Sequence, residues 1–203
     1  MDMKSSNQLL IFPNSNSGYG VGQEGIHCDE NTPLNPVSLY GKLKVKVEQY
    51  LLDSGECVTF RFATVFGVSP RMRLDLLVND FTYRAFNDGF IVLYEPHFKR
   101  NYLHVQDAAR AFIHALNNYG KMKGKPYNVG LSNANLSKQE LCKAIQQQIP
   151  EFFVAISEIG KDPDKRNYVV SNKRIELTGY KPEINLQVGI SELIKGFQII
   201  RRN

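Results

Sequence analysis

Short apolar runs alternate along this chain with longer segments whose apolar residues recur at helical spacing. The short runs predict buried strands at 9–12, 57–63, 90–94 and 126–130. The longer segments predict helices at 39–54, 74–86, 105–116, 138–149 and 186–200. Because regular alternation of strands and helices is typical of strands joined by helical crossovers, the pattern predicts a parallel α/β sheet.

Local signals mark the ends of two of these helices. The first helix carries apolar residues at four-residue spacing, namely Leu39, Leu43, Val47 and Leu51. Gly55 is placed to end it, because glycine readily adopts the left-handed backbone found after a helix. Ser137 and Glu140 have the spacing of a capping box, which predicts a helix that begins at Lys138.

Bulk properties exclude several classes of protein. A chain of 203 residues can bury a sizeable core in one or two domains. Its net charge of +5 comes from dispersed basic residues without a nucleic-acid-binding motif, so we expect no nucleic-acid partner. No apolar run approaches the ~18 residues of a membrane span, so no membrane partner is expected. The scattered Cys28, Cys57 and Cys142 are typical of reduced thiols, and we expect a cytoplasmic protein.

Tyr40 and Lys44 place a phenol and an ammonium on one face of the first predicted helix, because residues four apart are neighbours there. The ammonium favours the phenolate form of the tyrosine, which is the form that accepts a proton. Tyrosine and lysine are also common on solvated helix surfaces, so the pairing alone is weak evidence. The pair is a candidate for general acid–base chemistry, with an ordinary helix surface as the alternative.

Ser15 lies in a polar, glycine-punctuated turn at 13–20 that follows the first predicted strand. Open α/β sheets bind their ligands at the carboxyl ends of the strands, and a hydroxyl can both donate to and accept from a substrate oxygen. The alternative is a turn serine that bonds only to local backbone. Together with Tyr40 and Lys44, Ser15 forms a possible hydroxyl–phenol–ammonium constellation.

Five segments of this chain, 14–20, 29–40, 61–67, 100–107 and 127–130, occur in an order that is found in a known family. They resemble segments of the extended short-chain dehydrogenase/reductases, and in particular of their nucleotide-sugar epimerases and dehydratases. In this order, they are similar to five elements of the family: the serine-bearing strand end, the segment before the catalytic tyrosine, the strand beside the nicotinamide, the R-D-[FY]-[IV]-H-V-x-D element and the N-[VI]-G strand end.

The resemblance implies an α/β fold with a Rossmann-like parallel sheet, of which this chain holds the second half only. A smaller α/β substrate-binding domain would be interleaved with it. Residues 1–68 would form the C-terminal half of the NAD(P)-binding domain and carry the Ser/Tyr/Lys site. Residues 69–203 would form the substrate-binding region, interleaved with the last Rossmann elements at about 98–130.

The resemblance also implies roles for particular residues. The catalytic group would be Ser15, Tyr40 and Lys44. NAD or NADP would be bound by Tyr40, Lys44, Thr64 and Val65, although the family often has asparagine where Thr64 stands. A nucleotide-diphosphate sugar would be bound by Ser15, Asn79, Arg100 and Arg166. Asn79 is equally well interpreted as an amide on a helix surface, and Arg166 as part of a charged loop. Members of the family are expected to be homodimers through the tyrosine-bearing helix.

Asn16 and Ser17 bear on the type of reaction. The 4,6-dehydratases of the family carry an Asp-Glu pair at these two places, which acts at C5 and C6 of the sugar. An amide and a hydroxyl cannot replace a carboxylate acid or base, so dehydration is disfavoured. Epimerisation at C4, oxidation at C4 and reduction of a 4-keto sugar remain.

A glycine pattern at Gly20, Gly22 and Gly25 matches G-x-G-x-x-G but is not expected to bind a dinucleotide. The pattern is meaningful only where it opens a helix, and the next residues lack helical periodicity and include Pro33. In the family the cofactor cradle precedes the serine-bearing strand, so we expect a fragment that lacks the cradle. The alternative function is a non-catalytic nucleotide-sugar binding fragment, or a structural partner of a separate cofactor-binding chain.

Overall fold

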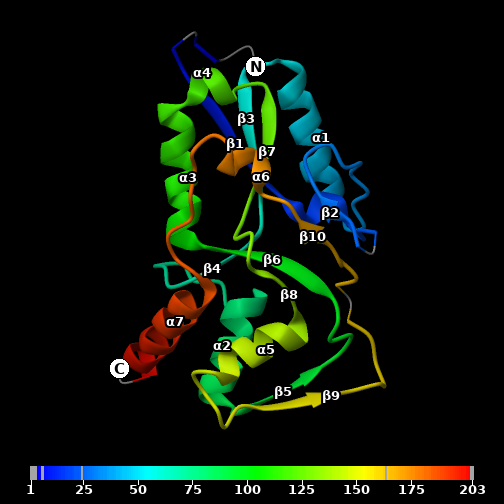
Figure 1. Cartoon of the computed structure of the whole chain (residues 1–203), viewed down its shortest axis with the longest axis vertical. Helices are drawn as coiled ribbons and strands as arrows, with labels where there is room; N and C mark the ends of the chain where they lie inside the picture. Colours follow the sequence, from blue (N-terminus) through cyan, green and yellow to red (C-terminus); the bar gives the residue numbers. More distant parts are fainter. Residues whose placement is uncertain (1–3, 6, 24, 163, 202–203) are drawn as a thin grey trace.

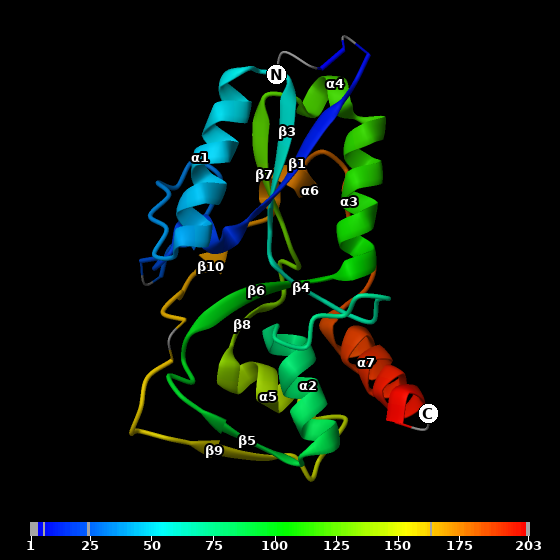
Figure 2. The same ribbon diagram turned by 180° about the vertical axis from the view of Figure 1, so that it is seen from behind.

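The computed structural model describes residues 4–5, 7–23, 25–162 and 164–201, and Figure 1 shows their arrangement. Three parallel strands form one sheet in the order β1 (Leu10–Ser15), β3 (Cys57–Phe62) and β7 (Lys125–Val129). Helices α1 (Leu39–Asp53) and α3 (Val105–Asn117) cover its opposite faces, as both Figure 1 and Figure 2 show. The predicted parallel α/β arrangement is confirmed for this sheet.

The central strand β3 is buried along its whole length, and its two faces differ in chemistry. One face is apolar and comprises Val58, Phe60 and Phe62. Small residues of α3 pack in the same core, namely Ala108, Ala111 and Ala115. On the other face, the Thr59 hydroxyl donates to Glu48 of α1 at 2.7 Å, and Arg61 Nε donates to the same carboxylate at 2.9 Å. The sheet is therefore attached to α3 by apolar packing and to α1 largely through polar groups.

The apolar stripe that predicts α1 is not the face that packs on the sheet. Leu39, Leu43 and Val47 are 73%, 55% and 42% exposed, whereas Gly41 and Glu48 are buried. The reason is the polar face of β3, which selects the glutamate-bearing side of the helix. The helix itself ends as expected, since Ser54 is its C-cap and Gly55 follows with φ of 69°.

The second half of the molecule has its own core and is built around β6 (Lys99–His104). This strand pairs in parallel with β4 (Thr64–Phe66) and antiparallel with β8 (Asn135–Ser137). The antiparallel pair departs from the expected all-parallel arrangement, and it follows a tight turn after β7 in which Ala134 N donates to the Leu131 carbonyl at 3.0 Å. The core is covered by α2 (Leu77–Asn87), α5 (Lys138–Gln146) and α7 (Leu186–Arg201). A separate parallel pair, β5 (Phe90–Leu93) and β9 (Phe153–Ile156), lies at the far end (Figure 1).

The chain passes between the two halves several times. It leaves the first sheet at β4 and returns through β6, α3, α4 (Tyr119–Met122) and β7 (Figure 2). The segment at about 98–130 thus connects both cores. A division of the chain into domains at residue 68 stays a prediction.

Smaller elements complete the fold. The turn after β1 is a short 3-10 helix, η1 (Asn16–Tyr19), and β2 (His27–Cys28) pairs with β10 (Val169–Val170) ahead of α6 (Lys173–Glu176). The glycine pattern at 20–25 leads into β2 rather than a helix, in line with its rejection as a dinucleotide cradle. The capping box at Ser137 is present with both of its hydrogen bonds. Within the described ranges, no helix combines the length and apolarity needed to cross a membrane.

Candidate active site

A cavity of about 680 Å³ lies at the carboxyl ends of β1 and β3, between the first sheet and the second half of the molecule. It is lined by all of the predicted site residues except Asn79, namely Ser15, Tyr40, Lys44, Thr64, Val65, Arg100 and Arg166. These residues come from segments far apart in the sequence. The cavity is at the place where an open α/β sheet presents its ligand-binding edge.

Tyr40 and Lys44 point into this cavity from the first turns of α1. The Ser38 side chain caps the helix by accepting a hydrogen bond from Gly41 N at 3.1 Å. Lys44 Nζ donates to the Pro13 carbonyl at 2.8 Å and lies 5.9 Å from the centre of the Tyr40 ring. The ammonium thus binds β1 and lies near the phenol ring, and Tyr40 is 54% exposed.

Gly41, between the phenol and the ammonium, allows the helix to approach the strand end closely. A Cβ at this position would lie 2.9 Å from Pro36 Cβ and 3.0 Å from the Ser17 carbonyl oxygen. Such contacts are too short for any larger residue without a shift of the backbone. The glycine therefore sets the distance between Tyr40 and the turn that carries Ser15.

Ser15 is the last residue of β1 and the N-cap of η1. Its Oγ accepts a hydrogen bond from Ser17 N at 3.1 Å and lies 2.9 Å from Ser17 Oγ. The local backbone bond of a turn serine is thus present, and the hydroxyl also lines the cavity. Ser15 can therefore hold the local turn and still present its hydroxyl to a ligand.

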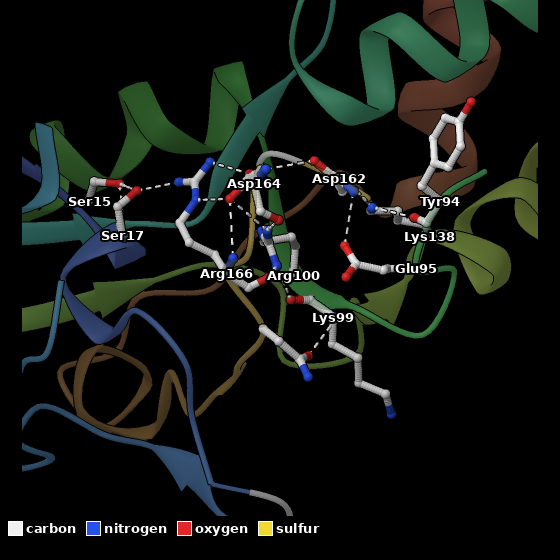
Figure 3. Close-up of polar contacts among 11 residues, drawn as sticks. Ser15, Ser17, Tyr94, Glu95, Lys99, Arg100, Lys138, Asp162, Asp164 and Arg166 are labelled. Carbon is white, nitrogen blue, oxygen red and sulfur yellow. Dashed lines mark hydrogen bonds and ion pairs between the residues drawn. The ribbon is translucent and has the colours of Figure 1, made fainter. Parts of the chain in front are cut away.

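The far side of the cavity carries three basic residues that are paired with acidic residues (Figure 3). Arg166 binds Asp164 through Nε at 2.7 Å and through Nη2 at 2.6 Å, and Arg100 Nη2 lies 3.1 Å from the same carboxylate. Burial alone would raise the pKa of the Asp164 carboxyl, but the hydrogen bonds and charges of the two guanidinium groups hold it well below its usual range. Lys138 pairs with Asp162 and donates to the Tyr94 carbonyl at 2.7 Å.

Arg100 is almost completely enclosed, with 2% of its surface exposed. It donates to the carbonyls of Lys99, at 2.8 Å, and of Arg166. Much of its hydrogen-bonding capacity therefore holds the segment at 164–166 in place. Its guanidinium still borders the cavity and contributes positive charge there.

Asn79 lies outside the cavity lining. Its side chain is buried near the start of α2, where Oδ1 accepts from Gly67 N at 3.1 Å and Nδ2 donates to the Arg73 carbonyl at 2.9 Å. The amide thus fixes the two ends of the turn between β4 and α2. The structure brings Arg73, rather than Asn79, to the edge of the cavity.

Several cavity residues were not predicted from the sequence: Asn14, Ser17, Lys138, Asp162, Asp164 and Tyr168. The sequence predicts Lys138 only as the first residue of a helix, and nothing local indicates that it is 3% exposed. The charged run at 162–166 was the one signal available for the acidic residues. Asn14 Oδ1 is buried and has no hydrogen-bond partner within the described part of the chain. The alternation of residues along a strand does not predict such an unpaired amide oxygen.

The histidine and cysteine side chains of the described residues do not form a metal centre. In the portion of the chain that the structure describes, no group of three or more metal-ligating side chains comes together. Cys28, Cys57 and Cys142 are free, buried thiols. His104 has a structural role, because it caps α3 by accepting from Gln106 N at 3.3 Å, and burial lowers its pKa.

Curated relatives of this chain are nucleotide-sugar epimerases by name. The UDP-glucose 4-epimerase of Lactobacillus helveticus is 26% identical over 201 residues, which cover 87% of this chain and 59% of that protein. The CDP-paratose 2-epimerase of Salmonella typhi is 26% identical over 179 residues, covering 81% and 53% respectively. This chain therefore spans less than two thirds of the length of these relatives.

Solved structures share the fold. The UDP-glucose 4-epimerase of Thermus thermophilus, in complex with NAD, superposes with a TM-score of 0.78 at 24% identity, covering 94% of this chain and 64% of that one. The dTDP-glucose 4,6-dehydratase of Bacillus anthracis, also with NAD, gives 0.79 at 20% identity, covering 96% and 63%. The model of the NAD dependent epimerase/dehydratase family matches residues 3–130, which is more than half of the chain. The chain is therefore a member of the NAD dependent epimerase/dehydratase family.

Proposed function

We propose that this chain carries the catalytic residues of an NAD(P)-dependent enzyme acting on a nucleotide-diphosphate sugar. One observation carries the proposal: Ser15, Tyr40 and Lys44 come from β1 and α1 and line a single cavity. The names of the relatives support the substrate class. Because the chain spans 53% to 61% of the curated relatives it matches, the activity proposed is that of the whole protein.

Ser15, Tyr40 and Lys44 have different roles in the reaction at one sugar hydroxyl. Tyr40, as phenolate, accepts the hydroxyl proton, and Ser15 donates a hydrogen bond to the same oxygen. Lys44 keeps the positive charge beside the phenolate and has donors left after its bond to Pro13, since an ammonium has three. The bound nicotinamide cofactor supplies the acceptor for the hydride of the sugar carbon.

The cavity has groups that fit the nicotinamide end of NAD or NADP. Asn14 lines the cavity, and its buried Oδ1 has no hydrogen-bond partner among the described residues, so this side chain keeps an unused acceptor near the site. Thr64 offers a hydroxyl, and Val65 offers an apolar surface beside it. The spare donors of Lys44 fit ribose hydroxyls.

Among the reactions of the family, we favour epimerisation or oxidation–reduction at C4 over 4,6-dehydration. Asn16 and Ser17 are each 1% exposed and supply no carboxylate beside Ser15. The relative from Lactobacillus helveticus, a UDP-glucose 4-epimerase by name, agrees with this choice. In an epimerisation the hydride returns to the opposite face of a 4-keto sugar, and Tyr40 returns the proton.

We also propose that the protein forms a homodimer through α1. The exposed residues Leu39, Leu43 and Val47 lie along one side of this helix, at the spacing of a helix–helix interface. Such a row of apolar residues, left on the surface of the single chain, is suited to a second copy of the same helix.

An alternative function is the binding of a nucleotide sugar without turnover. Within the described residues, no glycine-rich turn leads from a strand directly into a helix, and such a turn is the usual cradle for the cofactor pyrophosphate. On this alternative the cavity would bind the sugar nucleotide, and a separate polypeptide would bind the cofactor.

Two measurements on the purified protein separate these functions. Calorimetric titrations with UDP-glucose, UDP, NAD and NADP give the affinities, and NMR of UDP-glucose incubated with the protein and NAD follows conversion at C4. Binding with conversion supports the enzyme, and binding without conversion supports the alternative. If none of a panel of UDP, dTDP, CDP and GDP sugars binds, both proposals are wrong.

A further inference from the structure

Ser15 is connected to the opposite side of the cavity by a short series of hydrogen bonds (Figure 3). Its Oγ lies 2.9 Å from Ser17 Oγ, and Arg166 Nη1 donates to Ser17 Oγ. Ser17 is 1% exposed, so water does not compete at its hydroxyl. Arg166 belongs to the segment before β10, whereas both serines belong to the end of β1 and to η1.

The donors and acceptors of this series can be counted. A guanidinium only donates, so one lone pair of Ser17 Oγ is occupied by Arg166. Ser15 Oγ already accepts from Ser17 N at 3.1 Å. Two orientations remain for the bond between the hydroxyls, because either oxygen can be the donor.

The positive charge of Arg166 decides between the two orientations. An oxygen that accepts a bond from a cation becomes a weaker acceptor for a second bond, and its own hydrogen becomes a stronger donor. Ser17 therefore donates to Ser15. Ser15 Oγ then accepts two hydrogen bonds, and its own hydrogen is left to point into the cavity.

Arg166 is itself held in place by an acidic partner. Asp164 binds its Nε and Nη2 at 2.7 and 2.6 Å, which leaves Nη1 directed at Ser17. Arg100 binds Asp164 from a second direction at 3.1 Å. The orientation of the Ser15 hydroxyl thus depends on a charged cluster in the other half of the molecule.

From these contacts we infer that Ser17 and Arg166 are positioning residues that direct the Ser15 hydrogen toward the substrate oxygen. The inference rests on the proposed function for the identity of that oxygen. It adds a positioning role to the phosphate-binding role expected for Arg166, because Asp164 and Ser17 engage only three of its five N–H donors. Neither residue exchanges a proton with the substrate, and Ser15 remains the group in contact with it.

Neutron diffraction from crystals of the deuterated, ligand-free protein tests the inference without any need for activity. The expected density places deuterium of Ser17 on the line to Ser15 Oγ and deuterium of Ser15 toward the cavity. The reverse orientation, with Ser15 donating to Ser17, overturns the inference. An Arg166 side chain that does not reach Ser17 overturns it as well.

Kinetic measurements on variants test whether Ser17 and Arg166 affect turnover. We expect Ser17→Ala and Arg166→Gln to lower kcat about tenfold with little change in KM, as the loss of one directed hydrogen bond would. Ser17→Thr keeps a hydroxyl and is expected to retain kcat within about threefold, and Lys161→Gln, on the same segment, is the charge control. Unchanged kcat in Ser17→Ala contradicts the inference. Absence of turnover in the unaltered protein contradicts the proposed function and not this inference. In that case the orientation of the Ser15 and Ser17 hydroxyl groups in the neutron structure tests the inference.

Discussion

Glu48 of α1 and Arg61 of β3 form a buried ion pair, with Arg61 Nη2 2.9 Å from Glu48 Oε2 and side-chain exposures of 2% and 6%. Glu48 lies one helical turn beyond Lys44 and shares a face with it and with Tyr40. The pair therefore fixes the rotation of α1 that turns the phenol and the ammonium toward the cavity.

Glu48→Gln should destabilise the fold by about 3–5 kcal/mol, because it removes the carboxylate that is ion-paired with the buried Arg61 guanidinium. The free energy of unfolding in urea measures this. The matched control is Asp80→Asn, which breaks the pair with Arg84 at 2.8 Å on α2, where the side chains are 28% and 49% exposed. For the control we expect about 0–1 kcal/mol. If both variants lost the same free energy of unfolding, Glu48 would not anchor the helix.

Asp164 should contribute to stability only above acidic pH. Its folded-state pKa lies below the unfolded value of about 3.9, because Arg166 and Arg100 stabilise the carboxylate. The contribution is therefore fully present above about pH 5 and is lost as the pH falls through the folded-state pKa. Unfolding of the parent and of Asp164→Asn across pH 2–7 should give a stability difference that narrows below about pH 4. A difference that is constant with pH would contradict this assignment.

Leu43→Asp should convert a dimer into a monomer if α1 is the interface. A charge at a position that is 55% exposed in the single chain costs little there but much when a second helix covers it. Sedimentation velocity gives the oligomeric state. Ile113→Asp on α3, at 58% exposure, is the control and should leave the dimer intact. A parent protein that sediments as a monomer at high concentration would refute the proposed interface.

The sequence was informative where a feature depends on neighbouring residues. Tyr40 and Lys44 share a face because four residues separate them on a helix, and Ser15 follows directly from the end of a strand. The capping box at Ser137 is equally local. Each of these depends on backbone geometry that the residues themselves specify.

Features that depend on distant residues were not predicted. The contact between Ser17 and Arg166 joins positions 149 apart in the sequence, and the burial of Lys138 depends on Asp162 and the Tyr94 carbonyl. The face of α1 that packs on the sheet is chosen by Arg61 and Thr59 of β3, not by the helix's own apolar stripe. Helical periodicity identifies the helix but cannot tell which neighbour will cover which side.

In the function that we propose, Tyr40 exchanges a proton with a sugar hydroxyl in this cavity. The most direct test is the turnover of Tyr40→Phe, measured by NMR on UDP-glucose with saturating NAD, beside Tyr50→Phe on the same helix. Tyr50 is 64% exposed and is not among the residues that line the cavity, so its variant controls for loss of an exposed phenol from α1. We predict that kcat falls by about 100- to 10,000-fold in Tyr40→Phe and stays at the parent value in Tyr50→Phe, with unchanged affinity for UDP-glucose in both. Parent-level turnover in Tyr40→Phe would contradict the account.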